Sequence, residues 1–158
     1  MKKSRYQKLI HKLKYHGHYE IGFELGRLFG YDLKKSEWIK DVDFIVPVPL
    51  HPKRQKKRGY NQSELLSKQI AKAFCLRHFC PLSWIQYGGQ QAGKSRKERI
   101  KSRAFTMEIK KGFKDKIFGK DFLLVDDVAA TMSTVNECSR VLRENGSKSV
   151  GVIVISRN

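Results

Sequence analysis

Uninterrupted apolar runs at three places along the chain predict the strands of a sheet. Residues 44–50, 122–125 and 150–155 show no polar alternation, which is typical of strands buried on both faces. A shorter strand is predicted at residues 82–87, as the second strand of the same sheet. Residues 104–109 are predicted to form one strand of an edge ribbon.

Between these runs, apolar residues recur at the spacing of an α-helix. The helical stretches are residues 4–14, 20–30, 61–74 and 135–142. Asn61 and Glu64 have the spacing of a helix start, and Thr134 and Glu137 have the spacing of a capping box. Gly146 is placed to end the last helix.

The order of strand, helix and strand predicts an α/β fold, with a parallel sheet flanked by helices. The 158 residues suit a single domain with a real core. Residues 1–40 would form a helical N-terminal part and residues 41–158 the α/β core. Gly22, Gly26 and Gly30 recur every four residues and would let a neighbouring element approach closely.

Composition changes this picture mainly through charge. The formal net charge of +18 favours an anionic ligand, a nucleic acid or an acidic protein surface as a partner. Cys75, Cys80 and Cys138 form neither an even disulfide set nor a four-ligand zinc site, so reduced thiols are expected. The sequence has no run long enough to span a membrane and no signal peptide, which predicts a cytoplasmic protein.

The candidate chemistry lies directly after the apolar run 122–125. Asp126 and Asp127 follow this run, and a loop of small residues then leads into a helix. This order places backbone N–H groups and the positive helix end at the carboxyl edge of the sheet, where an anion can bind. The carboxylates would accept hydrogen bonds from sugar hydroxyls, so a ribose carrying a phosphate fits both halves. The alternative is an ordinary turn with solvated aspartates.

The same stretch resembles the phosphoribosyl pyrophosphate (PRPP) loop of type I phosphoribosyltransferases. That family has apolar residues, Asp-Asp, an apolar residue and then a Thr-Thr-Gly-Ala/Gly-Thr loop. Asp126 and Asp127 match the acidic pair, and Thr131 and Thr134 match two loop threonines. The resemblance implies a Rossmann-like fold in which both aspartates hold the ribose hydroxyls, as the catalytic pair, and residues 130–134 hold the 5′-phosphate.

The residues at three loop positions differ from those that are usual in the family. Ala130 replaces the first threonine, Met132 replaces the glycine, and Ser133 fills the position of a small residue. A left-handed backbone at Met132 would cost roughly 1–2 kcal/mol. Ala130 and Met132 therefore favour weak or absent transferase activity and leave open whether the protein is an enzyme.

A basic stretch follows the first predicted strand, with five cations among the six residues from 53 to 58. Residues 46–50 and 58–62 read Val-Pro-Val-Pro-Leu and Arg-Gly-Tyr-Asn-Gln, which is nearly the signature of the ComF family, a competence-associated branch of phosphoribosyltransferase-like proteins. The resemblance implies a loop at the pyrophosphate end of PRPP. Lys53, Arg54 and Arg58 would bind the pyrophosphate together with Mg²⁺, which the ligand itself carries, so no protein metal ligand is expected. The alternative is a solvated loop.

Two further segments resemble the ComF family. Residues 9–17 are similar to the start of its main domain, before which many members carry a zinc finger; this chain is identified as a short form without one. Gln91 and Arg99 match the flexible loop that closes over substrate, although Trp84 and Gln86 stand where arginines are expected. The cations of this loop fit a solvated face equally well.

The functional hypothesis is a PRPP-binding, phosphoribosyltransferase-like protein associated with competence and DNA uptake, whose acceptor the sequence does not identify. One alternative is a non-catalytic protein that binds single-stranded DNA through cationic loops, with Tyr60, Trp84 and Tyr87 for stacking. Another is a regulator that senses PRPP. The expected partners are PRPP or another phosphorylated ribose, single-stranded DNA and proteins of the competence machinery.

Overall fold

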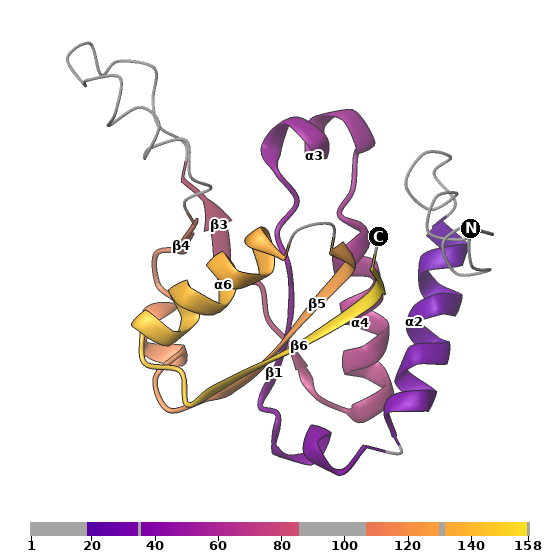
Figure 1. Ribbon diagram of the computed structural model, residues 1–158, viewed down its shortest axis with the longest axis horizontal. Coiled ribbons are helices and arrows are strands. Elements are labelled where there is room, and N and C mark those ends of the chain that lie inside the picture. The colour runs from indigo at the N-terminus through magenta and orange to yellow at the C-terminus, as the bar shows by residue number, and fades with distance from the viewer. Residues whose placement is uncertain (1–18, 35, 86–106, 130–131, 158) are drawn as a thin grey trace.

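The computed structural model describes residues 19–34, 36–85, 107–129 and 132–157. Its centre is a four-stranded sheet in which all neighbouring strands are parallel (Figure 1). The strand order across the sheet is β2 (Arg77–His78), β1 (Phe44–Pro47), β5 (Asp121–Ala129) and β6 (Ser149–Arg157). The predicted α/β fold is confirmed.

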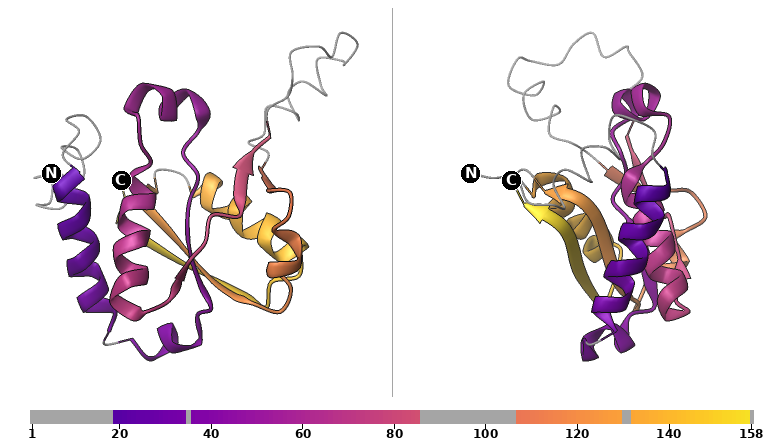
Figure 2. Two further views of the ribbon diagram at one scale, coloured as in Figure 1. Left: turned by 180° about the vertical axis from the view of Figure 1, so that it is seen from behind. Right: turned by 90° about the vertical axis from the view of Figure 1, so that its right-hand side faces the viewer.

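Helices cover both faces of this sheet (Figures 1 and 2). One face packs against α2 (Tyr19–Leu33) and α4 (Gln62–Phe74). The other face packs against α6 (Ser133–Glu144) and an antiparallel ribbon of β3 (Leu82–Trp84) and β4 (Met107–Ile109). The short connecting helices are η1 (Glu37–Asp41), α3 (Pro52–Arg58) and η2 (Lys114–Lys116). In the described part of the chain, no helix has the length and apolar character needed to cross a bilayer.

The strand period of two divides the apolar residues of β1 and β5 between two cores. Ile45 and Leu123 contact the side of α2 and α4, whereas Val46 and Leu124 contact the side of α6. All four are fully buried, which confirms that these two strands are covered on both faces. Each buried side chain of this size stabilises the fold by about 1.5–3 kcal/mol.

The second strand of the sheet was predicted in the wrong place. The strand that follows α4 and pairs with β1 is β2, which contains only Arg77 and His78. The predicted strand at residues 82–87 is instead β3, in the antiparallel ribbon with β4. Two polar residues give no apolar run, so β2 carries no pattern that sequence analysis can detect. The edge-ribbon prediction is confirmed for Met107–Ile109.

The last strand, β6, is confirmed as a strand but is not buried on both faces. Within the described part of the chain, it lies at the edge of the sheet and pairs only with β5. The Val152 residue of β6 is 37% exposed. The neighbouring Gly151 lies close to β5, because a Cβ at this position would be 3.2 Å from Leu123 Cδ1. The apolar run correctly predicted the strand but not its place at the edge, which depends on the strand order.

Two of the three regularly spaced glycines bring α2 against α4. A Cβ on Gly26 would lie 2.7 Å from Gln69 Cβ and 3.1 Å from the Leu66 carbonyl oxygen. A Cβ on Gly30 would lie 2.8 Å from Ala73 Cβ. These contacts are closer than two carbon atoms tolerate, so the expectation of close approach is confirmed for both positions.

We expect Gly26→Ala to destabilise the protein by about 1–3 kcal/mol, because the added methyl group overpacks the contact between α2 and α4. At an unobstructed helical position the same change stabilises by roughly 0.4–1 kcal/mol. Urea denaturation of wild type and variant distinguishes the two signs. A more stable variant would show that the two helices do not approach this closely.

Candidate functional site

The acidic pair lies where β5 extends beyond the end of β1. The register of these strands ends at the pairing of Pro47 with Val125, followed by a hydrogen bond from Val48 N to Val125 O (2.9 Å). Asp126 and Asp127 come next, with β6 still paired on the other side of β5. The prediction placed the pair after the strand. The structure places it within the strand, which continues through Ala129.

Ser63, in the first turn of α4, fixes the Asp126 carboxylate. Its Oγ donates to Asp126 Oδ1 (2.9 Å), and the Asp127 backbone N–H donates to the same oxygen (2.9 Å). Asn61 caps this helix by accepting from Ser63 N (3.1 Å), and its Nδ2 donates to Val48 O (3.0 Å). The end of β1, the start of α4 and the acidic pair are thus linked in one hydrogen-bonded chain. The predicted helix start at Asn61 is confirmed.

Sequence analysis missed Ser63 as a site residue. Its contact with Asp126 joins residues 63 positions apart, which no local pattern reveals. One signal was present: Ser63 follows the N-cap of the helix after the first strand. The loop between a strand and the next helix of a parallel sheet lies at the same carboxyl edge as the acidic pair.

A buried amide lies beside this link. Gln62 is 1% exposed, and its Oε1 accepts from the guanidinium of Arg58 (3.2 Å). Within the described residues, Gln62 Nε2 is buried without a hydrogen-bond partner. Such a donor costs about 1–3 kcal/mol when it is left unsatisfied, so a ligand oxygen at this position would recover free energy.

The basic stretch was predicted as a loop, but it forms the helix α3. Pro52 occupies its first turn, His51 Nδ1 accepts from Lys53 N (3.2 Å), and Gly59 ends it with a left-handed φ of 79°. Lys53 and Arg54 are exposed, whereas Arg58 is half-buried. A helix with no apolar face gives no periodic signal, which explains the error.

Met132 has the left-handed conformation that the family glycine would favour. Its φ is 57° and its ψ is −4°, and it is the N-cap of α6, where its carbonyl oxygen accepts from Asn136 N (2.8 Å). Its side chain packs against the core under α6. That packing holds a residue with a Cβ in a conformation that costs roughly 1–2 kcal/mol. A methionine therefore has, at this position, a backbone conformation that glycine adopts without strain.

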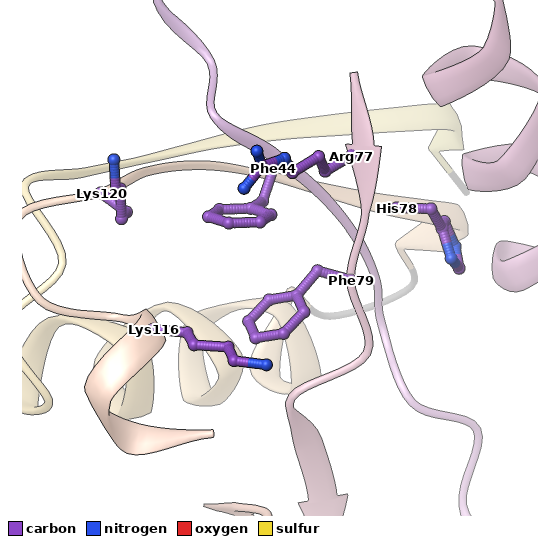
Figure 3. Close-up of a pocket in the computed structure, with 6 residues that line it drawn as sticks. All are labelled: Phe44, Arg77, His78, Phe79, Lys116 and Lys120. Atoms are coloured by element: carbon purple, nitrogen blue, oxygen red, sulfur yellow. The ribbon is translucent and has the colours of Figure 1, made fainter. Parts of the chain in front are cut away.

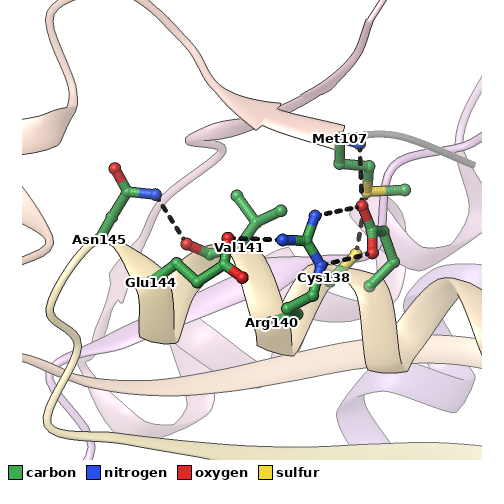
Figure 4. Close-up of polar contacts among 7 residues, drawn as sticks. Met107, Cys138, Arg140, Val141, Glu144 and Asn145 are labelled. Carbon is green, nitrogen blue, oxygen red and sulfur yellow. Dashed lines mark hydrogen bonds and ion pairs between the residues drawn. The ribbon is translucent and has the colours of Figure 1, made fainter.

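The capping box predicted at the start of α6 is not formed, because the helix begins at Ser133 and Thr134 already lies in its first turn. Glu137 instead accepts from the Arg140 guanidinium (2.7 Å), which lowers the pKa of that carboxyl group (Figure 4). Arg140 also pairs with Glu144 along the helix. The Met132 side chain, at the N-cap of α6, makes no capping hydrogen bond.

The remaining predicted residues have mixed outcomes. Ser133 is exposed and Thr134 half-buried at the start of α6, whereas Ala130, Thr131, Gln91 and Arg99 lie outside the described residues. The Trp84 ring packs edge-on against His51 at 5.1 Å, and its Nε1 donates to Pro49 O (3.2 Å). Among the described residues, no three His, Cys, Asp or Glu side chains are grouped to hold a metal ion.

The sheet order, the flanking helices and the acidic pair at the carboxyl end of β5 define a phosphoribosyltransferase-like fold. The structure is similar to the PRPP amidotransferase of Bacillus subtilis (TM-score 0.57, 19% identity, 84% of this chain and 25% of that chain). It is also similar to a hypoxanthine phosphoribosyltransferase of Staphylococcus aureus (TM-score 0.50, 14% identity, 89% of this chain and 65% of that chain). At these identities the likeness concerns the fold alone.

Sequence relatives identify the family. The chain is 32% identical over 155 residues to Competence protein F of Haemophilus influenzae. It is 31% identical over 162 residues to DNA utilization protein YhgH of Salmonella typhimurium. Each alignment covers 94% of this chain and 66% of the relative's length. No family model matches the sequence. The chain belongs to the ComF family of phosphoribosyltransferase-like proteins.

The left-handed conformation of Met132 has a measurable consequence. Met132→Ala and Met132→Gly both remove the packed side chain, but only glycine lacks the Cβ that is strained at this φ. We expect the alanine variant to be less stable than the glycine variant by about 1–2 kcal/mol in urea denaturation.

Ser139, within α6, provides the control for this comparison, because alanine should there be the more stable replacement by about 1 kcal/mol. An alanine variant at position 132 that matched or exceeded the glycine variant would contradict the left-handed conformation.

Proposed function

We propose that the protein binds PRPP, or another phosphorylated ribose, at the acidic pair, and that it acts in DNA uptake. The observation that carries the proposal is the position of Asp126 and Asp127 at the carboxyl end of a central strand, beside the first turn of α4. Ligands of open α/β sheets bind at this edge. The names of the relatives, Competence protein F and DNA utilization protein, support the second part.

The carboxylates of Asp126 and Asp127 differ in hydrogen bonding and in burial, and both environments suit the binding of ribose hydroxyls. Asp126 is half-buried and is held by Ser63, so its orientation is set before a ligand arrives. Asp127 is 8% exposed, and a hydrogen bond at a buried carboxylate is stronger than one in water. In the proposed complex they accept hydrogen bonds from the ribose hydroxyls, and residues 130–134 hold the 5′-phosphate at the start of α6.

The pyrophosphate end of the ligand would face α3 and the start of α4. Lys53 and Arg54 project into solvent there, Arg58 binds Gln62, and the buried Gln62 Nε2 offers a further donor. Cations and amide donors of this kind bind phosphate oxygens. In this proposal Mg²⁺ enters with the pyrophosphate and neutralises part of its charge.

In a transfer reaction, the bond from the anomeric carbon to the pyrophosphate oxygen breaks and the pyrophosphate leaves with the electron pair. The acceptor then bonds to the same carbon, which passes through an oxocarbenium-like state. Ala130 lacks the hydroxyl of the family threonine, and Met132 carries a Cβ where glycine allows a phosphate to approach. We therefore propose slow or absent turnover, and a PRPP-sensing regulator is the second candidate.

The proposal predicts that PRPP with Mg²⁺ binds the wild-type protein and that Asp127→Asn weakens binding about 10- to 150-fold. This range corresponds to the roughly 1.5–3 kcal/mol of a hydrogen bond to a charged group. Calorimetric titration, with ribose 5-phosphate as a second ligand, measures both affinities.

Asp115→Asn is the matched control, because it removes the same charge at an exposed position in η2 and should leave the affinity unchanged. The ligand assignment is wrong if millimolar PRPP with Mg²⁺ gives no binding to the wild-type protein.

A further inference from the structure

A pocket of about 570 Å³ lies at the end of the sheet opposite the acidic pair. Phe44, the first residue of β1, lies on its inner wall (Figure 3). Phe44 pairs in register with Phe122, four residues before Asp126 on β5, so the pocket and the acidic pair are separated by about 13 Å along that strand. The size of the pocket suits a ligand as large as a nucleotide.

Aromatic rings form the inner wall of this pocket. The ring centroids of Phe44 and Phe79 are 4.8 Å apart, and those of Phe79 and Phe113 are 5.1 Å apart. Phe122 stacks against Phe44 from within the core at 5.5 Å. Phe79 lines the pocket and is only half-buried, so part of this aromatic surface remains accessible, while Phe113 supports it from behind the lining. A planar base stacks on such a surface whatever its identity.

Cations surround the aromatic wall. Arg77, Lys116 and Lys120 are exposed and come from β2, η2 and the turn before β5 (Figure 3). Lys120 is paired with Asp43 (3.3 Å). Lys116 Nζ lies 5.6 Å from the centroid of the Phe113 ring. Among the described residues, neither Arg77 nor Lys116 forms an ion pair, so both charges are available to an anion.

His78 also lines the pocket, but strand alternation turns its ring away from Arg77 and Phe79 (Figure 3). The ring is within 2.8 Å of Ser67 Oγ, and burial lowers the pKa of its imidazole. The lowered pKa favours the neutral imidazole, so the positive charge of the pocket comes mainly from the arginine and the lysines.

A second pocket, between α6 and β6, lacks this combination. It has about 500 Å³ and contains two arginines, but Arg140 is already paired with Glu137 and Glu144. Its apolar lining consists of Val150 and Val152, with no aromatic ring. A pocket with one of its two arginines already paired and with aliphatic walls offers no surface on which a planar base can stack. The pocket at β2 has both unpaired cations and accessible rings.

We propose that the pocket formed by Phe44, Arg77, Phe79 and Lys116 binds a nucleotide, either free or as one unit of a single-stranded nucleic acid. The base would stack on the phenylalanine surface, and the phosphate would bind Arg77 and Lys116. Nothing in the ligand chemistry of the acidic pair requires this pocket. The proposal therefore stands or falls independently of PRPP binding.

The test measures the affinity of a fluorescently labelled oligothymidylate by anisotropy at low and moderate salt. The variant Arg77→Ala/Lys116→Ala removes two exposed cations of the pocket. The control Lys111→Ala/Lys114→Ala removes the same charge from exposed positions nearby that do not line the pocket. We expect about tenfold weaker binding for the pocket variant than for the control. Its log–log salt slope should be smaller than that of wild type by about 0.7, because the two substitutions remove the contact to one phosphate.

Two further ligands identify what the pocket recognises. An abasic oligomer of the same length keeps the phosphates without the bases, and thymidine monophosphate is the free nucleotide. The wild-type protein should bind the abasic oligomer more weakly than oligothymidylate, because the abasic strand has no base to stack on the phenylalanine surface. If thymidine monophosphate displaces oligothymidylate from the wild-type protein, the pocket is a site for free nucleotides. If the monophosphate does not displace it, the single strand is the ligand. Either result supports the proposal.

Three results would overturn the inference. Equal affinity of the pocket and control variants shows that the cations act only through net charge. Equal affinity of the wild-type protein for the abasic oligomer and for oligothymidylate shows an anion site without base recognition. A loss confined to Lys53→Ala/Arg54→Ala would place nucleic acid on α3 and also reject the pocket. Because Arg77 and Lys116 are exposed, both pocket substitutions are expected to fold, which a thermal melt of each variant checks.

Discussion

The hydrogen bond from Ser63 to Asp126 is the contact on which the candidate site depends. It joins the unit of β1 and α4 to the neighbouring strand β5 at the edge where β1 ends. Asn61 supports this link by capping the helix that carries Ser63 and by donating to the carbonyl oxygen of Val48, the first residue after β1. Without the Ser63 hydrogen bond, the Asp126 carboxylate would lose this side-chain connection to α4.

Sequence patterns predicted the parts of this arrangement that have a local cause. The buried run of β5, the apolar face of α6 and the cap at Asn61 follow from periodicity and capping chemistry. The strand β2 and the helix α3 were missed because neither has an apolar period. The Ser63 contact was missed for a different reason: it exists only after two distant segments meet, and the hydroxyl itself has no distinguishing signature.

Met132 departs from the family pattern and has a left-handed backbone conformation. Packing of its side chain against the core offsets part of the strain. In the proposed complex with a phosphate, its Cβ would lie where the family has glycine. The two ends of the sheet also differ in chemistry, since carboxylates and a buried amide lie at the carboxyl end and unpaired cations with phenylalanines lie at the other.

The most direct test of this account is calorimetric titration of Ser63→Ala with PRPP and Mg²⁺. The account predicts about tenfold weaker binding than wild type, which corresponds to roughly 1.4 kcal/mol, because the Asp126 carboxylate loses the side-chain donor that helps to orient it. Ser139→Ala, whose hydroxyl donates only to the Val135 carbonyl oxygen of its own helix, should bind as wild type does. Unchanged PRPP affinity in Ser63→Ala would contradict the central claim.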